Sequence, residues 1–86
     1  MRVHSVVGVD LQRIGDEAML LHPTGTRALA LSATALAVWA RCSEVADVDD
    51  IVQELAHDYG TTPERIKADV HTTIHQLSDL GFIQIT

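Results

Sequence analysis

Hydrophobic and polar residues alternate over the first third of the chain and then follow a helical period. Residues 3–9 are rich in β-branched side chains, residues 10–15 form a weaker extended stretch, and residues 18–21 are a short apolar run. The sequence HPTGT at 22–26 predicts a turn, because its proline fixes φ and its glycine permits a positive φ. We therefore expect two or three antiparallel strands in this part of the chain.

The strand expected at residues 26–31 is apolar on both of its faces. Its leucines, Leu29 and Leu31, fall on one face, and its alanines, Ala28 and Ala30, fall on the other. A strand with one face in solvent would carry polar residues on that face. Either another helix of the same domain covers the alanines, or the strand lies at a sheet edge that accepts another extended chain.

Three amphipathic helices are predicted after residue 31, from apolar positions that recur at a period of 3.6. Their candidate N-caps and ends are, in order, Ser32 and Ser43, Asp47 and Gly60, and Thr62 and Gly81. The buried stripes expected on them are Ala35, Leu36, Trp39 and Cys42; Val48, Ile51, Val52, Leu55 and Tyr59; and Ile66, Val70, Ile74 and Leu77. Residues 82–86 alternate again as a short strand or an extended tail. The order of strands followed by three helices predicts an α+β fold.

Length and composition predict one globular domain over residues 1–86. The chain is 47% hydrophobic and 21% charged, a composition typical of soluble domains. Its longest apolar run is too short for a membrane span, and we see no signal peptide. The single cysteine, Cys42, excludes an internal disulfide framework and favours a reducing compartment, so we expect a cytoplasmic protein. A domain of this size also has little room for an internal active site.

The charge distribution argues against nucleic acid as a partner. Twelve acidic and six basic residues give a net charge of −6. Binding to phosphates needs clustered Lys and Arg side chains. The basic residues are instead scattered along the chain: Arg2, Arg13, Arg27, Arg41, Arg65 and Lys67.

Three groups of residues could carry chemistry, and each has a simpler structural interpretation. His71 and His75 are four residues apart on a helix and could share a metal, but no third ligand follows at a suitable spacing. Cys42 lies at a helix C-terminus, where a thiol pKa is raised, and we expect it to be buried. The acidic residues 47–50 suit a helix start better than a metal loop. We therefore predict no catalytic residues, no metal and no cofactor.

Taken together, three segments resemble the PqqD-like peptide-recognition domains, also called RiPP recognition elements. These are GDEAMLLHPTGTRALALSATALAVWARC at 15–42, DVDDIVQELAHDYG at 47–60 and TPERIKADVHTTIHQLSDLGFI at 62–83. The resemblance implies a winged-helix-like fold in which a three-stranded antiparallel sheet is followed by three helices. It also implies a protein that is not an enzyme and that binds the leader segment of a ribosomally made precursor peptide.

In this family the leader adds as an extra strand beside the third strand, against the third helix. Carried onto this sequence, the resemblance places the peptide against Arg27, Ala28, Leu29, Ala30 and Leu31. The helix side would consist of Lys67, Val70, Thr73, Ile74 and Leu77, with Asp69 available to a basic leader residue. The implied partners are the precursor leader peptide and a separate leader peptidase or other modifying enzyme. A chain of this size resembles the stand-alone proteins of lasso-peptide pathways, and the type that serves a radical enzyme is the other possibility.

Two other functions are compatible with the same elements. A winged-helix DNA-binding regulator would place the third helix in the major groove, which requires basic or amide side chains on its exposed face. That helix carries Asp69 and Asp79 as well as Arg65 and Lys67, so its charge argues against DNA binding. A small metal-dependent enzyme would depend on His71 and His75 alone.

Overall fold

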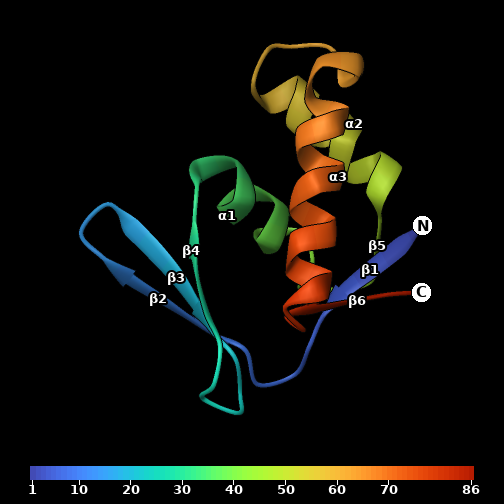
Figure 1. Ribbon diagram of the computed structural model, residues 1–86. Helices are drawn as coiled ribbons and strands as arrows, with labels where there is room; N and C mark the ends of the chain where they lie inside the picture. The colour runs from blue at the N-terminus through green and yellow to red at the C-terminus, as the bar shows by residue number, and fades with distance from the viewer.

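The computed structural model describes residues 1–86 and consists of two small antiparallel sheets and three helices (Figure 1). The elements are β1 (Arg2–Ser5), β2 (Asp10–Ile14), β3 (Glu17–Leu21), β4 (Ala28–Leu31), α1 (Ala33–Ala40), β5 (Ala46–Asp47), α2 (Val48–Asp58), α3 (Pro63–Asp79) and β6 (Ile83–Ile85). The α+β class and the three helices are confirmed. A second three-stranded sheet is added to the one that was predicted. No helix is both long enough and apolar enough to cross a membrane.

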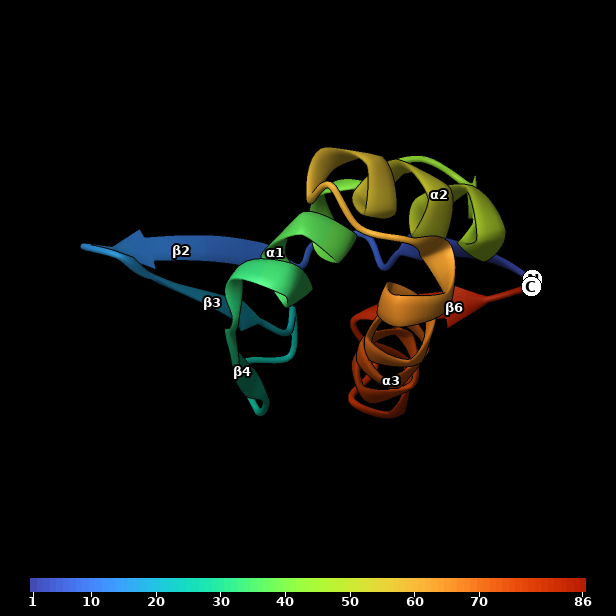
Figure 2. The same cartoon turned by 90° about the horizontal axis from the view of Figure 1, so that it is seen from above.

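The predicted hairpins form a sheet with the strand order β2-β3-β4. Leu20 of β3 lies opposite Leu11 of β2 and Leu29 of β4, so these three side chains share the face that points toward the helices. The turn at residues 22–26 is present, and Gly25 has a φ of +72° there. The β2–β3 hairpin projects away from the helices (Figures 1 and 2).

The first strand differs from its prediction in length and in partner. β1 ends at Ser5, because the chain turns at Gly8, which has a φ of +90°, and Val7 is 93% exposed. β1 then pairs with β5 on one side and with β6 on the other instead of joining the hairpins. This second sheet brings the two ends of the chain together, as Figure 2 shows.

The hydrophobic core lies between the helices and the β5-β1-β6 sheet. It contains fifteen buried residues, among them the predicted stripe of α3 and most of that of α2. The prediction that Tyr59 is buried is wrong, because α2 ends there and the side chain is 49% exposed. Trp39 packs on the edge of the core and is partly buried.

Two of the three predicted N-caps close their helices with a side-chain hydrogen bond. The Ser32 hydroxyl accepts the Ala35 N–H at 3.1 Å, and the Asp47 carboxylate accepts the Asp49 N–H at 2.9 Å. Thr62 occupies the N-cap of α3 without such a bond. α1 ends at Ala40, earlier than expected, because residues 41–44 form a turn.

Candidate functional site

Strand β4 has one edge without a partner. β3 pairs with only one of its edges, because the strand order is β2-β3-β4. In an antiparallel ladder, hydrogen-bonded pairs of residues alternate with pairs that are not bonded to each other. His22 and Arg27 are a bonded pair, because the His22 N–H donates to the Arg27 carbonyl oxygen at 2.9 Å. The pairs that contain Ala28 and Ala30 are therefore not bonded, and the N–H and C=O groups of these two alanines point away from β3, toward the free edge. An extended chain could bond to those groups.

The two faces of β4 have different surroundings. Leu29 and Leu31 are partly buried and pack against the core. Ala28 and Ala30 are exposed on the other face, beside Met19, which is 42% exposed. The possibility that a helix of the same domain covers the alanines is therefore wrong.

Helix α3 stands opposite β4, with α1 behind them. In both Figure 1 and Figure 2, β4 lies to one side of α1 and α3 to the other. α1 is set back from the two elements, on the side of α2, as Figure 2 shows. α1 packs against both elements. The free edge of β4 is on the side of the sheet toward α3 (Figure 2).

One flank of α3 faces β4. Viewed from its N-terminus, as in Figure 2, successive residues of a right-handed helix advance clockwise by about 100°. The buried stripe points back into the core, so the flank on the β4 side carries residues at the spacing i, i+4 and i+7. These residues are Asp69, Thr73 and Gln76. Asp69 and Gln76 are exposed, and Thr73 is half-buried. We call this flank, together with the free edge of β4, the β4–α3 site.

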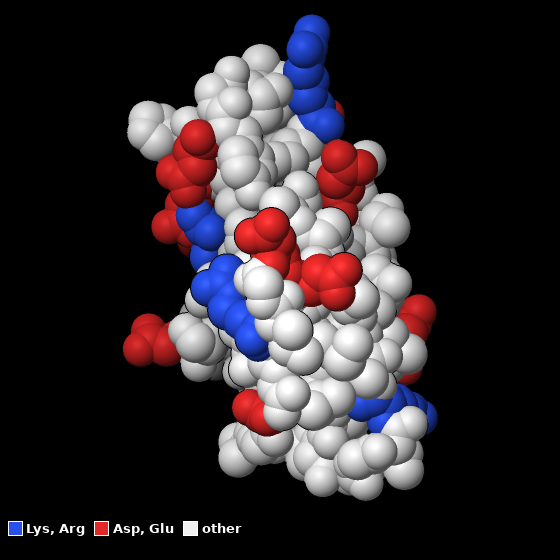
Figure 3. All heavy atoms as spheres, turned by 90° about the vertical axis from the view of Figure 1, so that its left-hand side faces the viewer, with Lys and Arg blue, Asp and Glu red and all other residues white.

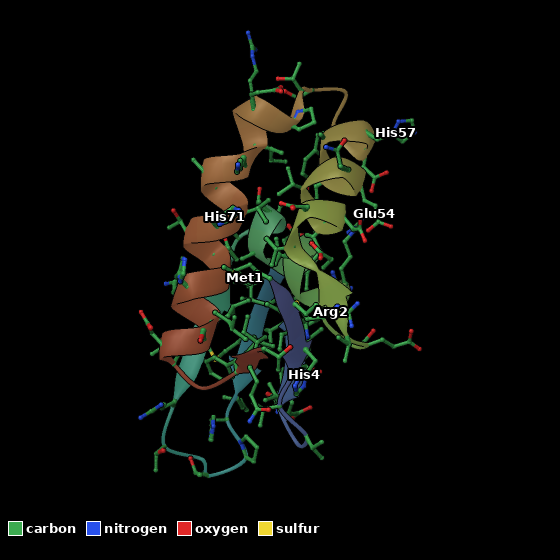
Figure 4. The ribbon with its side chains drawn as sticks, turned by 90° about the vertical axis from the view of Figure 1, so that its right-hand side faces the viewer. Met1, Arg2, His4, Glu54, His57 and His71 are labelled. Atoms are coloured by element: carbon green, nitrogen blue, oxygen red, sulfur yellow. The ribbon has the colours of Figure 1, made fainter.

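Only some of the helix residues expected at the site lie on this flank. Val70, Ile74 and Leu77 are completely buried, so they support α3 from within the core. Lys67 lies on the other flank, where it lines a hollow with Asp49 and other residues of α2. His71 is also on that far flank, as Figure 4 shows from the side opposite β4. Gln76 was missed as a site residue, although its spacing of seven from Asp69 placed it on the same face.

The β4–α3 site is closed at one end by contacts between the turn before β4 and the end of α3. The Arg27 guanidinium donates a hydrogen bond to the Leu80 carbonyl oxygen at 3.0 Å. The rings of His22 and Phe82 meet edge-on, with 5.8 Å between their centroids. At the other end, β4 leads directly into α1 through Ser32.

The candidate catalytic and metal-binding groups do not assemble into a reactive centre. Nowhere in the chain do three His, Cys, Asp or Glu side chains gather as they would around a metal ion. Burial raises the pKa of the Cys42 thiol to about 11, and the thiol donates to the Val38 carbonyl oxygen at 3.3 Å. A thiol with this pKa is protonated at neutral pH and is a poor nucleophile.

None of the surface hollows lies between β4 and α3, although two of them reach a residue of the β4–α3 site: Gln76 borders a hollow on α3 that it shares with His71 and His75, and Ala30 borders another. The hollow at Ala30, of about 60 Å³, lies on the outer face of the β2-β3-β4 sheet, and it is also lined by Ile14 and Met19 among others. The β4–α3 site therefore offers a strand edge and a helix flank, and not an enclosed pocket. Such an arrangement suits an extended peptide better than a compact small molecule.

A free strand edge facing a helix flank is the geometry of a module that binds peptides by strand addition. The chain belongs to the PqqD family, because the family model described as "Coenzyme PQQ synthesis protein D (PqqD)" matches residues 17–83. The resemblance noted from the three sequence segments is thereby confirmed. A comparison with curated proteins found no match.

Solved structures share the fold over nearly the whole chain. "TbiB1 in Complex with the TbiA(beta) Leader Peptide" has a TM-score of 0.79 at 23% identity and covers 96% of both chains. The PqqD truncation of Methylobacterium extorquens PqqCD, described as a stand-alone RiPP recognition element, has a TM-score of 0.80 at 24% identity, with 98% of this chain and 89% of that chain covered. "Lasso peptide synthetase B1 complexed with the leader peptide" has a TM-score of 0.79 at 16% identity, with 96% and 98% covered.

Proposed function

We propose that this protein binds the leader segment of a ribosomally synthesised precursor peptide by strand addition at β4. The observation that carries the proposal is the unpaired edge of β4 opposite a helix flank, in a chain of the PqqD family. Two of the solved structures with this fold hold a leader peptide, by their own descriptions, which supports the same function here.

The leader pairs with β4 through the N–H and C=O groups of Ala28 and Ala30. Main-chain bonds supply much of the affinity in this mode of binding, and pockets for alternate side chains supply selectivity. These main-chain bonds place the added strand at the usual spacing of about 4.8 Å, and the small side chains of Ala28 and Ala30 leave room beside them for side chains of the peptide. Thr73 and Gln76 then contact the peptide from α3, and Asp69 attracts a basic leader residue.

The protein presents the bound leader to separate enzymes and does not itself catalyse a reaction. The partner is a leader peptidase or another modifying enzyme in the cytoplasm. We favour a lasso-peptide pathway, because one of the leader-bound structures with this fold is described as a lasso peptide synthetase B1.

Binding to DNA is the weaker alternative. The chain carries a net charge of −6, and on the face in Figure 3 the Lys and Arg side chains cover only a small part of the surface and are interspersed with Asp and Glu. Without a continuous basic surface, we expect only non-specific affinity for a duplex, with a Kd of about 10⁻⁴ M or weaker. Sequence-selective submicromolar retention in a mobility-shift titration would favour the regulator.

A proline scan of the two sheet edges tests strand addition. Ala30→Pro removes an N–H that faces the free edge and places a ring there, while it spares the ladder to β3. Arg13→Pro is the matched control, because the register turns the Arg13 N–H toward the free edge of β2. The probe is the most enriched peptide from a displayed library of short random peptides, labelled with fluorescein.

We expect Ala30→Pro to weaken binding of this probe at least about tenfold, the equivalent of one or two lost hydrogen bonds. The control should bind like the wild type, and circular dichroism should show that both variants are folded. Thr73→Trp should obstruct the site from α3, whereas Ala68→Trp, on the exposed side of the same helix, should not. Folded Ala30→Pro and Thr73→Trp proteins that bind normally would place the peptide elsewhere.

A further inference from the structure

The β2-β3-β4 sheet is connected to the end of α3 by a single hydrogen bond. The bond from the Arg27 guanidinium to the Leu80 carbonyl oxygen, at 3.0 Å, joins positions 53 residues apart. No other hydrogen bond, from main chain or side chain, links residues 10–31 with residues 42–86. Arg27 therefore makes the only hydrogen bond between this sheet and the end of α3.

Gly81 leaves the space that this contact needs. Its φ is +80°, and a Cβ atom at this position would lie 3.3 Å from Arg27 Nη1 and 3.3 Å from His22 Nε2. Any side chain would crowd both groups and strain the backbone. Phe82, the next residue, packs against the His22 ring. The turn at 22–27 and the segment 80–82 therefore fit together closely.

We propose that Arg27 is a positioning residue for the leader peptide, and that it sets the separation between β4 and α3. β4 is fixed at its far end by its junction with α1, where Ser32 caps the helix. Arg27 fixes its near end to the last turn of α3. The edge between these two points, at Ala28 and Ala30, stays unpaired, and its separation from α3 is fixed at both ends. This role rests on the proposed function and differs from direct contact with the peptide.

The physical reason is the entropy of the free protein. Leu29 and Leu31 keep β4 on the core, but without the Arg27 bond the near end of the strand has more freedom relative to α3, so binding must first restore one separation. The peptide then loses affinity although no group that touches it has changed. If Arg27 contacted the peptide directly, the loss of affinity in an Arg27 variant would depend on which side chains the peptide carries.

The first measurement is made on the free protein. Arg27→Ala is compared with Arg13→Ala, which removes the same charge from an arginine that makes no hydrogen bond or salt bridge. We expect Arg27→Ala alone to shift the amide resonances of residues 28–31 and 81–82, and to speed amide hydrogen exchange in β4 about tenfold. Unchanged resonances and exchange in β4 would overturn the positioning role, whether or not any peptide binds.

The second measurement is the affinity for the library-selected peptide. We expect Arg27→Ala to bind about threefold to tenfold more weakly than Arg13→Ala, and Arg27→Lys to recover part of the loss, because an ammonium can also donate to the Leu80 oxygen. The loss should persist when acidic residues of the peptide are replaced by their amides. A loss confined to the acidic peptide would show direct contact, and equal affinities of the two alanine variants would refute positioning. A wild type that binds no peptide would instead remove the proposed function.

Discussion

The β2-β3-β4 sheet and the helical body, which comprises the three helices and the β5-β1-β6 sheet, are built in opposite ways. Leu20 is the only residue that the β2-β3-β4 sheet contributes to the fifteen-residue core cluster. Every residue of β2 is exposed, whereas α3 buries four side chains along its length. Packing energy is therefore concentrated in the body, and the sheet has most of its surface free for other contacts.

This difference suits a protein that lends one strand edge to a partner. An exposed edge is a liability, because it can pair with any extended chain. Here the edge is limited to the four residues of β4 and begins next to a charged side chain, Arg27. The body supplies the stability that the sheet lacks, so the edge can stay open without loss of the fold.

The largest expected effect comes from one substitution made in both regions. Ile74 is completely buried in the body, and Ile14 is 78% exposed in the sheet. Ile74→Ala should lower the free energy of unfolding by about 2–5 kcal/mol, because it removes apolar contacts and leaves a cavity. Ile14→Ala should change it by about 0.5 kcal/mol or less. Urea unfolding measures both, and equal losses would contradict the division into two regions.

Because Cys42 is buried in the body, the free energy of unfolding should depend on pH where its thiol titrates. Burial raises the pKa of Cys42 from 9.0 to about 11, so the unfolded chain loses this proton first as the pH rises. The thiol then contributes stability that is complete below pH 9 and is lost between pH 9 and about 11. The loss amounts to about 2–3 kcal/mol.

Cys42→Ala is the control for this titration, since the other groups that titrate near pH 10 are the same in both proteins. Denaturant unfolding at several pH values gives the difference between the two slopes. Identical slopes above pH 9 would show that the thiol reaches solvent in the folded state.

Amide hydrogen exchange should separate the two regions without any mutation. Amides of α3 such as that of Ile74 should exchange only through global unfolding, while those of β2, such as that of Gln12, should exchange through local opening of the hairpin. We expect exchange at least about tenfold faster in β2. Protection in β2 equal to that in α3 would mean that the sheet and the body unfold as one unit.

The smallest effect is expected at the surface of the body. Arg41 donates to the Ala37 carbonyl oxygen at 3.0 Å, forms a salt bridge with Glu54 at 3.4 Å and contacts Asp58. These contacts are partly exposed, so Arg41→Ala should cost only about 0.5–1 kcal/mol, and less at high salt. Arg65→Ala, which breaks no ion pair, should cost less still. A salt-independent loss above this range would indicate packing by the arginine stem.

Local patterns along the chain were sufficient to predict most of the elements. The periodicity of α2 and α3, the turn at 22–26 and the caps at Ser32 and Asp47 depend on residues close in sequence, and all of them are present. The two apolar faces of β4 left two possibilities open, a covering helix or a strand edge, and the exposure of Ala28 and Ala30 decides for the edge. The prediction that Tyr59 is buried was wrong, because a periodic pattern does not show at which residue the helix ends.

Other features were decided by contacts between distant residues. β1 pairs with β5 and β6, which no pattern within residues 2–5 could indicate. Lys67 and Asp69 are two residues apart, but they lie on opposite flanks of α3, and only the packing of that helix on the core determines which flank faces β4.

The sequence by itself determined the α+β class, the three helices and a strand that is apolar on both faces, because propensity, capping and periodicity act over a few residues. The tertiary structure alone decided that β4 is an edge, that α3 stands opposite it, and that Arg27 reaches the Leu80 carbonyl oxygen from 53 residues away. Those features depend on how separate elements pack around one core, and the free energy of that packing is shared among residues far apart in the chain.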